Sequence, residues 1–284
     1  MTTILSIQSS VAYGHVGNSA AVFPLQRLGH EVWPVFTVVF SNHTGYGAWR
    51  GPLLTAEDVA DVIRGVEDRG AFASCEAVLS GYQGAEDVGA VVLDAVARVK
   101  KAAPNAVYCC DPVMGDVGRG MFVRPGIPEF MRDRVVPAAD VVTPNHFELD
   151  FLAGTTTTTL DGLLEAAHRV RASGPSVVLV TSAILEDTPD NALDMVAVSA
   201  GGAWRTRTPR LAVSPPGAGD LTAAVFLANL LSGHPLETVL ARTTSSVFAV
   251  VDATTAAGER EMRIVQTQDL LAEPRTEFAP EKVG

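Results

Sequence analysis

The sequence predicts an α/β fold: a mostly parallel central sheet with helices on both sides and a hairpin at one edge. Two observations predict it. Short, continuously apolar runs rich in β-branched residues recur along the chain, as in strands that are buried on both faces. Segments with helical period lie between these runs, which is typical of βαβ units. The 284 residues, 47% of them hydrophobic, also supply ample material for a large core.

The expected strands are the apolar runs, and they cover residues 3–7, 32–40, 77–82, 106–111, 140–144 and 176–182. The vicinal Cys109 and Cys110 are most simply two residues of one strand. In the last third, "DMVAVSA" and "GGAWRTRTP" predict a hairpin around Gly201 and Gly202. A final edge strand is expected over 260–266.

The first expected helix lies in "TAEDVADVIRGVEDRG", where Val59 and Ile63 share one face and Thr55 with Asp58 forms a candidate capping box. Further helices are expected over 86–102, 160–174, 219–232 and 236–252. The run 155–159 is interpreted as a loop. No repeat or linker divides the chain, so we expect one domain over residues 1–284, with a loosely ordered tail after about residue 272.

Charge and cysteine content limit the classes of partner. The formal net charge is -11 and no Lys/Arg cluster is present, which argues against nucleic acid as a partner. Three cysteines without zinc-ligand spacing fit a reducing compartment. No signal peptide and no apolar run of membrane length is evident. We therefore expect a soluble, cytoplasmic protein without a membrane or nucleic-acid partner.

Polar residues follow several of the predicted strands. Ligands of open α/β sheets bind at the carboxyl ends of the strands, so Ser9, Asp111 and Thr181 are candidate site residues. Asn145 and Glu148 stand three apart at an expected helix start. They are either a capping pair or part of a magnesium site, because Mg²⁺ prefers oxygen ligands and keeps several waters.

The stretch Gly217-Ala218-Gly219-Asp220 precedes an apolar helix and also has two interpretations. Aspartate is a common N-cap, but glycines let a phosphate approach the backbone N–H groups of a helix start closely. Asp220 can then take the proton of an attacking hydroxyl. The loop lacks the lysine of a Walker A motif. His15 and His43 lie in glycine-bearing loops and are candidates to line a pocket, and no hydrolase triad stands out.

Five motifs together carry a resemblance: "SIQSSVAYGHVGNSAAVFPLQRLGHEVWPVFTVVFSNHTGYG", "LSGYQG", "CDPVMGD", "TPNHFEL" and "PPGAGDLTAA" occur in this order. The chain closely resembles the pyridoxal kinase family of the ribokinase-like superfamily, from about residue 4 to residue 250. "GxGD" and "DPVMG" are superfamily signals, whereas "QSSVAYGHVGN" and "FSNHTGYG" are specific to the pyridoxal branch.

The resemblance implies a ribokinase-like three-layer fold, a homodimer, and ATP-dependent phosphorylation of pyridoxal at its 5′-hydroxyl in vitamin B6 salvage. It implies Asp220 as general base, with Gly217, Ala218 and Gly219 as the anion-hole loop. It places the pyridine ring among Ser9, Val16, Phe40, Thr44, Gly45 and Tyr82. It assigns Mg²⁺ to Asp111, Asn145 and Glu148. It assigns ATP to Asp111, Asp116, Thr143, Glu148, Thr181, Ser182, Thr208, Pro209, Arg210 and Leu211, with K⁺ or Na⁺ as a further expected ion.

Two departures and two alternatives accompany the resemblance. Bacterial relatives often carry lysine where this chain has Thr181, whereas animal-type members resemble its "VTSA", and the loop more usually has threonine where this chain has Ala218. A hydroxymethylpyrimidine kinase of the same superfamily stays open, although those relatives tend to have a cysteine in the anion-hole loop. A non-catalytic protein that binds pyridoxal 5′-phosphate also stays open, and it would not need the base or the magnesium ligands.

Overall fold

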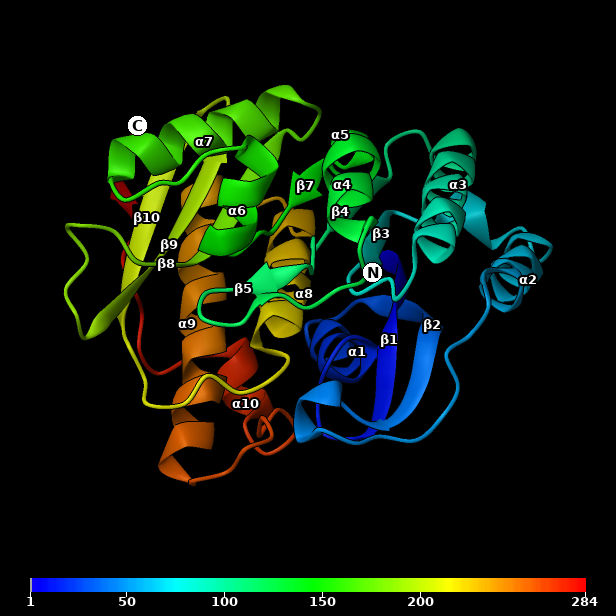
Figure 1. Ribbon diagram of the computed structural model, residues 1–284, viewed down its shortest axis with the longest axis horizontal. Helices are drawn as coiled ribbons and strands as arrows, with labels where there is room; N and C mark the ends of the chain where they lie inside the picture. Colours follow the sequence, from blue (N-terminus) through cyan, green and yellow to red (C-terminus); the bar gives the residue numbers. More distant parts are fainter. Residues whose placement is uncertain (1) are drawn as a thin grey trace.

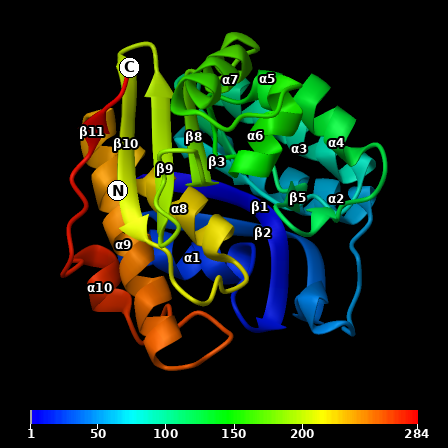
Figure 2. The same cartoon turned by 60° about the vertical axis from the view of Figure 1, so that its left-hand side comes forward.

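The computed structural model describes residues 2–284, and in that range nine strands form one sheet in the order β11-β10-β9-β8-β7-β4-β3-β1-β2. Six of them run parallel: β1 (Thr3–Tyr13), β2 (Glu31–Asn42), β3 (Ala77–Ser80), β4 (Val107–Cys110), β7 (Val141–Val142) and β8 (Val177–Ala183). Three antiparallel strands complete one edge: β9 (Ala192–Ser199), β10 (Gly202–Pro209) and β11 (Glu281–Lys282). Figures 1 and 2 show this edge beside the parallel part. The predicted mixed sheet and its hairpin are confirmed.

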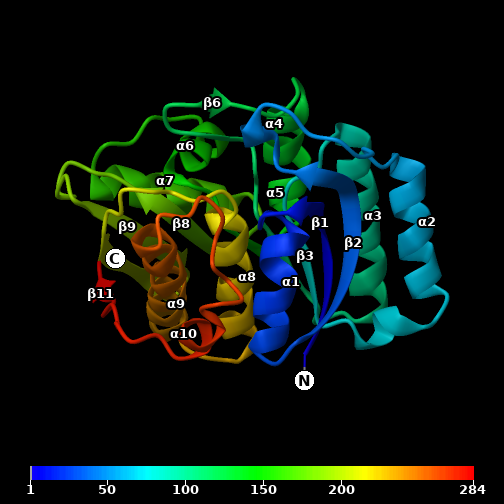
Figure 3. The same cartoon turned by 90° about the horizontal axis from the view of Figure 1, so that it is seen from below.

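Helices cover both faces of the sheet, so the molecule has three layers (Figure 3). One face carries α1 (Asn18–Arg27), α8 (Ala218–Leu231) and α9 (Leu236–Ala256), and α10 (Gln268–Ala272) packs on α9. The other face carries α2 (Ala56–Glu67), α3 (Glu86–Ala102), α4 (Ile127–Phe130), a π-turn (Met131–Val135), α5 (Val136–Ala138), α6 (His146–Ala153) and α7 (Leu160–Ala172). A small hairpin of β5 (Gly115–Asp116) and β6 (Gly120–Met121) lies outside the sheet.

The vicinal cysteines show how the strands divide the core. Cys109 faces α1, α8 and α9, whereas Cys110 faces the layer of α2 to α7, and both side chains are fully buried. Successive side chains of a strand point to opposite faces, and both faces are covered here, which explains why the strand sequences are continuously apolar. Helix α8 is apolar around its whole circumference because it packs between the sheet, α1 and α9.

Side chains at the helix starts supply the hydrogen bonds that the first turns lack. Thr55 and Asp58 form the predicted capping box of α2. Asn145 and Glu148 form a second capping box at α6, and Thr159 accepts from the N–H of Gly162 at α7. The loop 154–159 leads into α7 as expected.

Two features near the N-terminus differ from the predicted pattern. Strand β1 continues to Tyr13, through a register shift between Gln8 and Ser10 that leaves Ser9 inside the strand. Helix α1 was not predicted, because its inner face is not a simple apolar stripe. Its first residue, Asn18, is buried and donates to the carbonyls of Ser6, Gln8 and Val35.

The predicted edge strand over 260–266 is wrong, because these residues form turns. Met262 and Ile264 are buried against α8 and α9. The alternation of apolar and polar residues that resembles a strand therefore comes from two buried side chains of a loop. The edge strand is β11, which pairs with β10. Phe278 also packs on Phe248, so part of the tail after residue 272 is held in place. Within the described residues, each helix is too short or too polar to cross a membrane.

Candidate active site

A cavity of about 970 Å³ opens at the carboxyl ends of the parallel strands, between the sheet and the first turn of α8. All the residues that the resemblance assigns to the site line it: Ser9, Val16, Phe40, Thr44, Gly45, Tyr82, Asp111, Asp116, Thr143, Asn145, Glu148, Thr181, Ser182, Thr208, Pro209, Arg210, Leu211, Gly217, Ala218, Gly219 and Asp220. This is the expected position for a ligand site in an open α/β sheet. The cavity is of a size that holds a small organic molecule together with a nucleotide.

One end of the cavity is built by β1, α1 and a short turn after β2. Gly17, with φ of +53°, crosses directly over Ser9: a Cβ at Gly17 would lie 2.4 Å from the Ser9 hydroxyl. Only glycine permits this crossing. The turn Thr44–Tyr46 is capped by His43, whose Nδ1 accepts from the N–H of Gly45. These contacts arrange polar and aromatic groups around a small apolar space, which suits a flat ring.

The first turn of α8 faces the middle of the cavity. Gly217 is the N-cap, with φ of +85°, and a Cβ there would lie 1.8 Å from the carbonyl oxygen of His15. Ala218 and Gly219 follow as the first helical residues. Their N–H groups have no partner within the helix, and the helix dipole favours negative charge at this end. The turn can therefore bind an oxyanion such as a phosphate.

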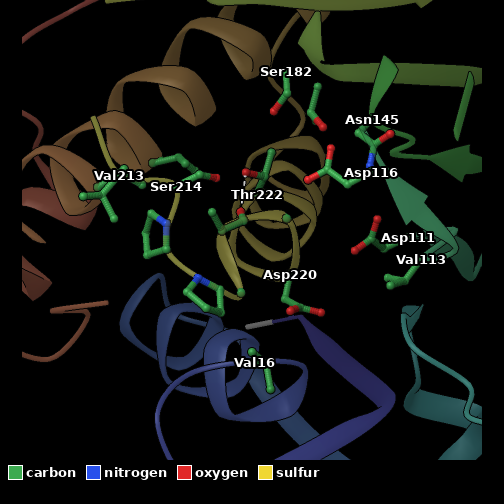
Figure 4. Close-up of a pocket in the computed structure, with 18 of the residues that line it drawn as sticks. Val16, Asp111, Val113, Asp116, Asn145, Ser182, Val213, Ser214, Asp220 and Thr222 are labelled. Atoms are coloured by element: carbon green, nitrogen blue, oxygen red, sulfur yellow. Dashed lines mark hydrogen bonds between the residues drawn. The ribbon is translucent and has the colours of Figure 1, made fainter. Parts of the chain in front are cut away.

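Three carboxyl groups converge beside this turn. Asp111 follows β4 and accepts from the Thr143 hydroxyl at 3.1 Å. Glu148 accepts from the N–H groups of Met114 and Asn145 at 2.8 and 3.0 Å. Asp220 lies in the first turn of α8, between Val16 and Asp111 in Figure 4.

Burial sets the charge state of these groups. It raises the pKa of Asp220 to about 6, although backbone N–H groups lower it in part. Burial likewise raises the pKa of Glu148 to about 7 against the opposing backbone hydrogen bonds. The pKa of Asp111 is raised well above its usual range, first by burial and then by the charges of Glu148 and Asp220. Asp220 is therefore suited to accept a proton near neutral pH.

The same carboxyl groups fit a bound cation. Their mutual repulsion would be relieved by positive charge between them, and carboxylate oxygen is the donor that Mg²⁺ prefers. No group of three His, Cys, Asp or Glu side chains in residues 2–284 is arranged to hold a metal alone, so water or ligand oxygens would have to complete the shell. Asn145 is occupied locally: its Oδ1 caps α6 and its Nδ2 donates to Gly115. The capping interpretation of Asn145 is thus confirmed, and its metal role stays a prediction.

The far end of the cavity is bounded by β8 and by the segment after β10. Ser182 has φ of +52°, the one non-glycine residue of the described chain with a left-handed backbone. It lies at a register shift of β8, where Thr181 also turns to the cavity. Backbone strain of this kind is often found at ligand sites. Thr208, Pro209, Arg210 and Leu211 form the adjoining wall.

Some lining residues were missed from the sequence. Thr222, Thr244 and Phe248 enter from α8 and α9, and Arg119 and Arg260 enter from loops. Nothing in the local sequence around the residues of α8 and α9 indicates that their side chains reach the cavity. Of the two histidines expected in the pocket, His15 is absent from the lining, whereas His43 is part of it.

Comparisons with known proteins agree with this geometry. A model of the phosphomethylpyrimidine kinase family matches residues 72–264. The chain is 56% identical to the pyridoxal kinase PdxY of Leifsonia xyli over 281 residues, which is 99% of each chain. The chain belongs to the pyridoxal kinase family. It is also 58% identical to the pyridoxal kinase PdxY of Rubrobacter xylanophilus, over 99% of this chain and 97% of the relative.

Solved pyridoxal kinases share the fold throughout. The pyridoxal kinase from Leishmania donovani in complex with ADP and pyridoxamine superposes with a TM-score of 0.92, at 29% identity over 100% of both chains. The pyridoxal kinase from Trypanosoma brucei gives 0.88 at 28% identity. The ribokinase-like fold predicted from the motifs is confirmed, and the chain is a phosphotransferase of the pyridoxal kinase type.

Proposed function

We propose that this protein transfers the γ-phosphate of ATP to the 5′-hydroxyl of pyridoxal, giving pyridoxal 5′-phosphate and ADP in vitamin B6 salvage. One observation carries the proposal: Asp220, whose pKa is raised to about 6, occupies the same first turn of α8 as Ala218 and Gly219, whose N–H groups have no partner within the helix. A base and an oxyanion site are thereby held next to each other at the cavity's centre.

The reaction needs three contributions from the chain. Asp220 accepts the hydroxyl proton while the hydroxyl oxygen forms a bond to the γ-phosphorus and the bond to ADP breaks. The N–H groups of the α8 turn stabilise the charge of the transferring phosphate. Asp111 and Glu148 would hold Mg²⁺, which supplies positive charge to the phosphates when bound.

The residues that line the two ends of the cavity support where we place pyridoxal and ATP. Ser9, Thr44 and Tyr82 surround the small end and suit the pyridine ring of pyridoxal. Thr181, Ser182 and Arg210 line the larger end and suit ATP. The complexes of the relatives from Leishmania donovani contain ADP with pyridoxamine or with pyridoxine, which supports the same pairing of ligands here.

We also propose that the chain forms one domain and a homodimer, as the resemblance implies. The low cysteine count supports a reducing compartment such as the cytoplasm. K⁺ or Na⁺ beside the ATP phosphates stays a prediction.

The decisive experiment is a coupled ATP assay with pyridoxal, using the wild type, Asp220→Asn and the control Asp269→Asn. Asp269 is an exposed acid that pairs with Arg27. Asp220→Asn should lower kcat by about a hundredfold or more, because the general base is lost. The control should match the wild type. A wild type that does not turn over, or an active Asp220→Asn, would contradict the proposal.

The two alternative functions are separated by a substrate panel. The family match to phosphomethylpyrimidine kinases keeps hydroxymethylpyrimidine as a candidate acceptor. Ala218, in place of a cysteine in the loop, favours pyridoxal. If hydroxymethylpyrimidine has the higher kcat/KM, that alternative is correct. Tight binding of pyridoxal 5′-phosphate without any turnover would instead indicate a non-catalytic binding protein.

A further inference from the structure

The segment Arg260–Met262, in the loop after α9, contacts the end of the site that we assign to pyridoxal and the turn at the start of α8. It lies more than two hundred residues away in sequence from His15, Gly45 and Tyr46, which it contacts. In Figure 1 this loop passes beside the ends of β1 and β2. Arg260 itself lines the cavity next to Thr44 and Gly45.

Glu261 connects the end of β1 to the turn after β2. Its carboxylate accepts from the Tyr46 hydroxyl at 2.7 Å and from the His15 N–H at 3.2 Å. His43 Nε2 lies 3.3 Å from the same carboxylate. The Glu261 side chain is 15% exposed, so these contacts are shielded from water. A Cβ at Gly14 would lie 2.1 Å from Glu261 Oε2, so the chain passes it closely.

Arg260 holds the same turn from its other side. Its guanidinium donates to the carbonyl oxygen of Gly45 at 2.8 Å and stacks over the Tyr46 ring at 3.9 Å. The hydrogen bond to Glu261 raises the pKa of Tyr46 to about 12, which is the direction expected for a phenol that donates to a carboxylate. Two neighbouring residues thus fix the backbone, ring and hydroxyl of one short turn.

Met262 extends the connection to the phosphate loop. It is buried with Leu221 and packs near Ala218. A Cβ at Gly217 would lie 3.0 Å from Met262 Cε and 1.8 Å from the carbonyl of His15. The backbone of residue 15 is therefore held by Glu261 on one side and abuts the phosphate loop on the other.

We propose that Glu261 is a positioning residue for the pyridoxal end of the site. It fastens the turn Thr44–Tyr46 and its cap, His43, to the end of β1, so that Thr44 and Gly45 face the ring of the substrate. Arg260 assists through Gly45 and Tyr46. The contacts of Glu261 go to the turn and to residue 15, and none goes to a residue assigned to ATP, so its loss changes the use of pyridoxal more than that of ATP. This inference rests on the proposed function, since it assigns the small end of the cavity to pyridoxal.

The test compares Glu261→Gln with Glu259→Gln in the full-length protein. Glu259 is an acid two residues away whose partner is Arg263, outside the cavity. Glu261→Gln removes the negative charge and replaces one carboxylate oxygen, which accepts hydrogen bonds, by an NH₂ group, which donates them. The two groups that donate to the carboxylate, the Tyr46 hydroxyl and the His15 N–H, then face another donor. We expect KM for pyridoxal to rise about tenfold or more, with KM for ATP within about twofold of the wild type. The control should leave both constants unchanged.

Two further variants test the route of the effect. Tyr46→Phe removes only the hydroxyl and keeps the ring under Arg260, so it should raise KM for pyridoxal several-fold. In the double variant with Glu261→Gln, Tyr46→Phe should raise KM for pyridoxal by less than it does alone, because both substitutions remove the same hydrogen bond between Tyr46 and Glu261. Equal increases in both KM values, or no increase beyond the Glu259→Gln control, would overturn the proposal.

A readout without turnover separates this inference from the proposed reaction. Hydrogen exchange at the amides of residues 43–47 should become at least tenfold faster in Glu261→Gln and stay unchanged in Glu259→Gln. If the wild type fails to phosphorylate pyridoxal but the exchange result holds, the turn is fastened as described and the reaction is misassigned. Unchanged exchange in Glu261→Gln would contradict the fastening itself.

Discussion

Asp220 combines two properties at one carboxyl group. In the role that we propose it must be ionised to accept a proton, yet it lies beside Asp111 in a cavity that disfavours charge. The backbone N–H of Gly17 and that of Asp220 itself offset part of the cost, which leaves the pKa near 6. An aspartate with the ordinary pKa would be a weaker base, and one raised much further would be protonated at neutral pH.

The pH profile of turnover follows from this value. A base works only in its deprotonated form, so kcat/KM for pyridoxal should be nearly constant above pH 7 and fall as pH drops through about 6. The fall should approach tenfold per pH unit. Steady-state rates at saturating ATP between pH 5 and 8 measure it. Because Glu148 and Asp111 titrate with Asp220, the inflection belongs to the group of carboxyls.

The residual activity of Asp220→Asn provides the control for that profile. Without the base the inflection near pH 6 should weaken or shift, because only Asp111 and Glu148 remain to titrate. An inflection that is unchanged in the variant would assign the titration to another group. An inflection in the wild type near pH 4 would mean that Asp220 is not desolvated in solution.

At the scale of elements, the start of α8 contains two glycines, Gly217 and Gly219, whose backbone conformations and surroundings differ. Gly217 needs its left-handed backbone and its closeness to His15, whereas Gly219 is helical and faces open space. A Cβ on Gly219 would lie 3.9 Å from the Asp111 carboxylate and from no closer neighbour. The fold thus requires Gly217, whereas Gly219 leaves a space beside Asp111 that the proposed phosphate can occupy.

Alanine substitutions should separate these requirements. Gly217→Ala should lower the free energy of unfolding by about 2–4 kcal/mol, because the new methyl meets a backbone carbonyl at a positive φ. Gly219→Ala should keep or slightly raise that free energy but lower kcat about tenfold or more, since it fills the space between the oxyanion site and Asp111. Thermal or urea unfolding and the coupled assay measure both. A Gly219→Ala enzyme with normal kcat would show that the phosphate does not approach there.

The helices and strands also show how much of the fold can be predicted from the sequence. Buried strands and amphipathic helices such as α2, α3 and α7 follow from local periods, and the strand-end polar residues follow from the topology of a parallel sheet. Helix α1 was missed because its buried Asn18 satisfies carbonyls of two strands. The segment 260–266 was misassigned because Met262 and Ile264 alternate like strand residues but anchor a loop. The contacts of Glu261 span more than two hundred residues, and no local pattern encodes them.

At the scale of the whole molecule, the β2 side carries an unusual exposed surface. Phe36 and Val39 on β2 and Trp49 and Leu53 on the following segment are between 37% and 46% exposed. The outer backbone of β2 is paired from Thr37 to Ser41, because Leu54 donates to Thr37, Val39 to Pro52 and Ser41 to Arg50. A partner would therefore pack on these side chains and not extend the sheet. Grouped apolar residues of this kind favour association.

We predict that this surface forms the interface of the proposed homodimer. The wild type should have the mass of a dimer at micromolar concentration by light scattering after gel filtration. Phe36→Lys should shift the protein to monomers, because a charge in the centre of a two-fold interface meets its own copy. Val265→Lys, at another exposed apolar residue, is the control and should stay dimeric. A monomeric wild type would exclude the dimer, and a dimeric Phe36→Lys would place the interface elsewhere.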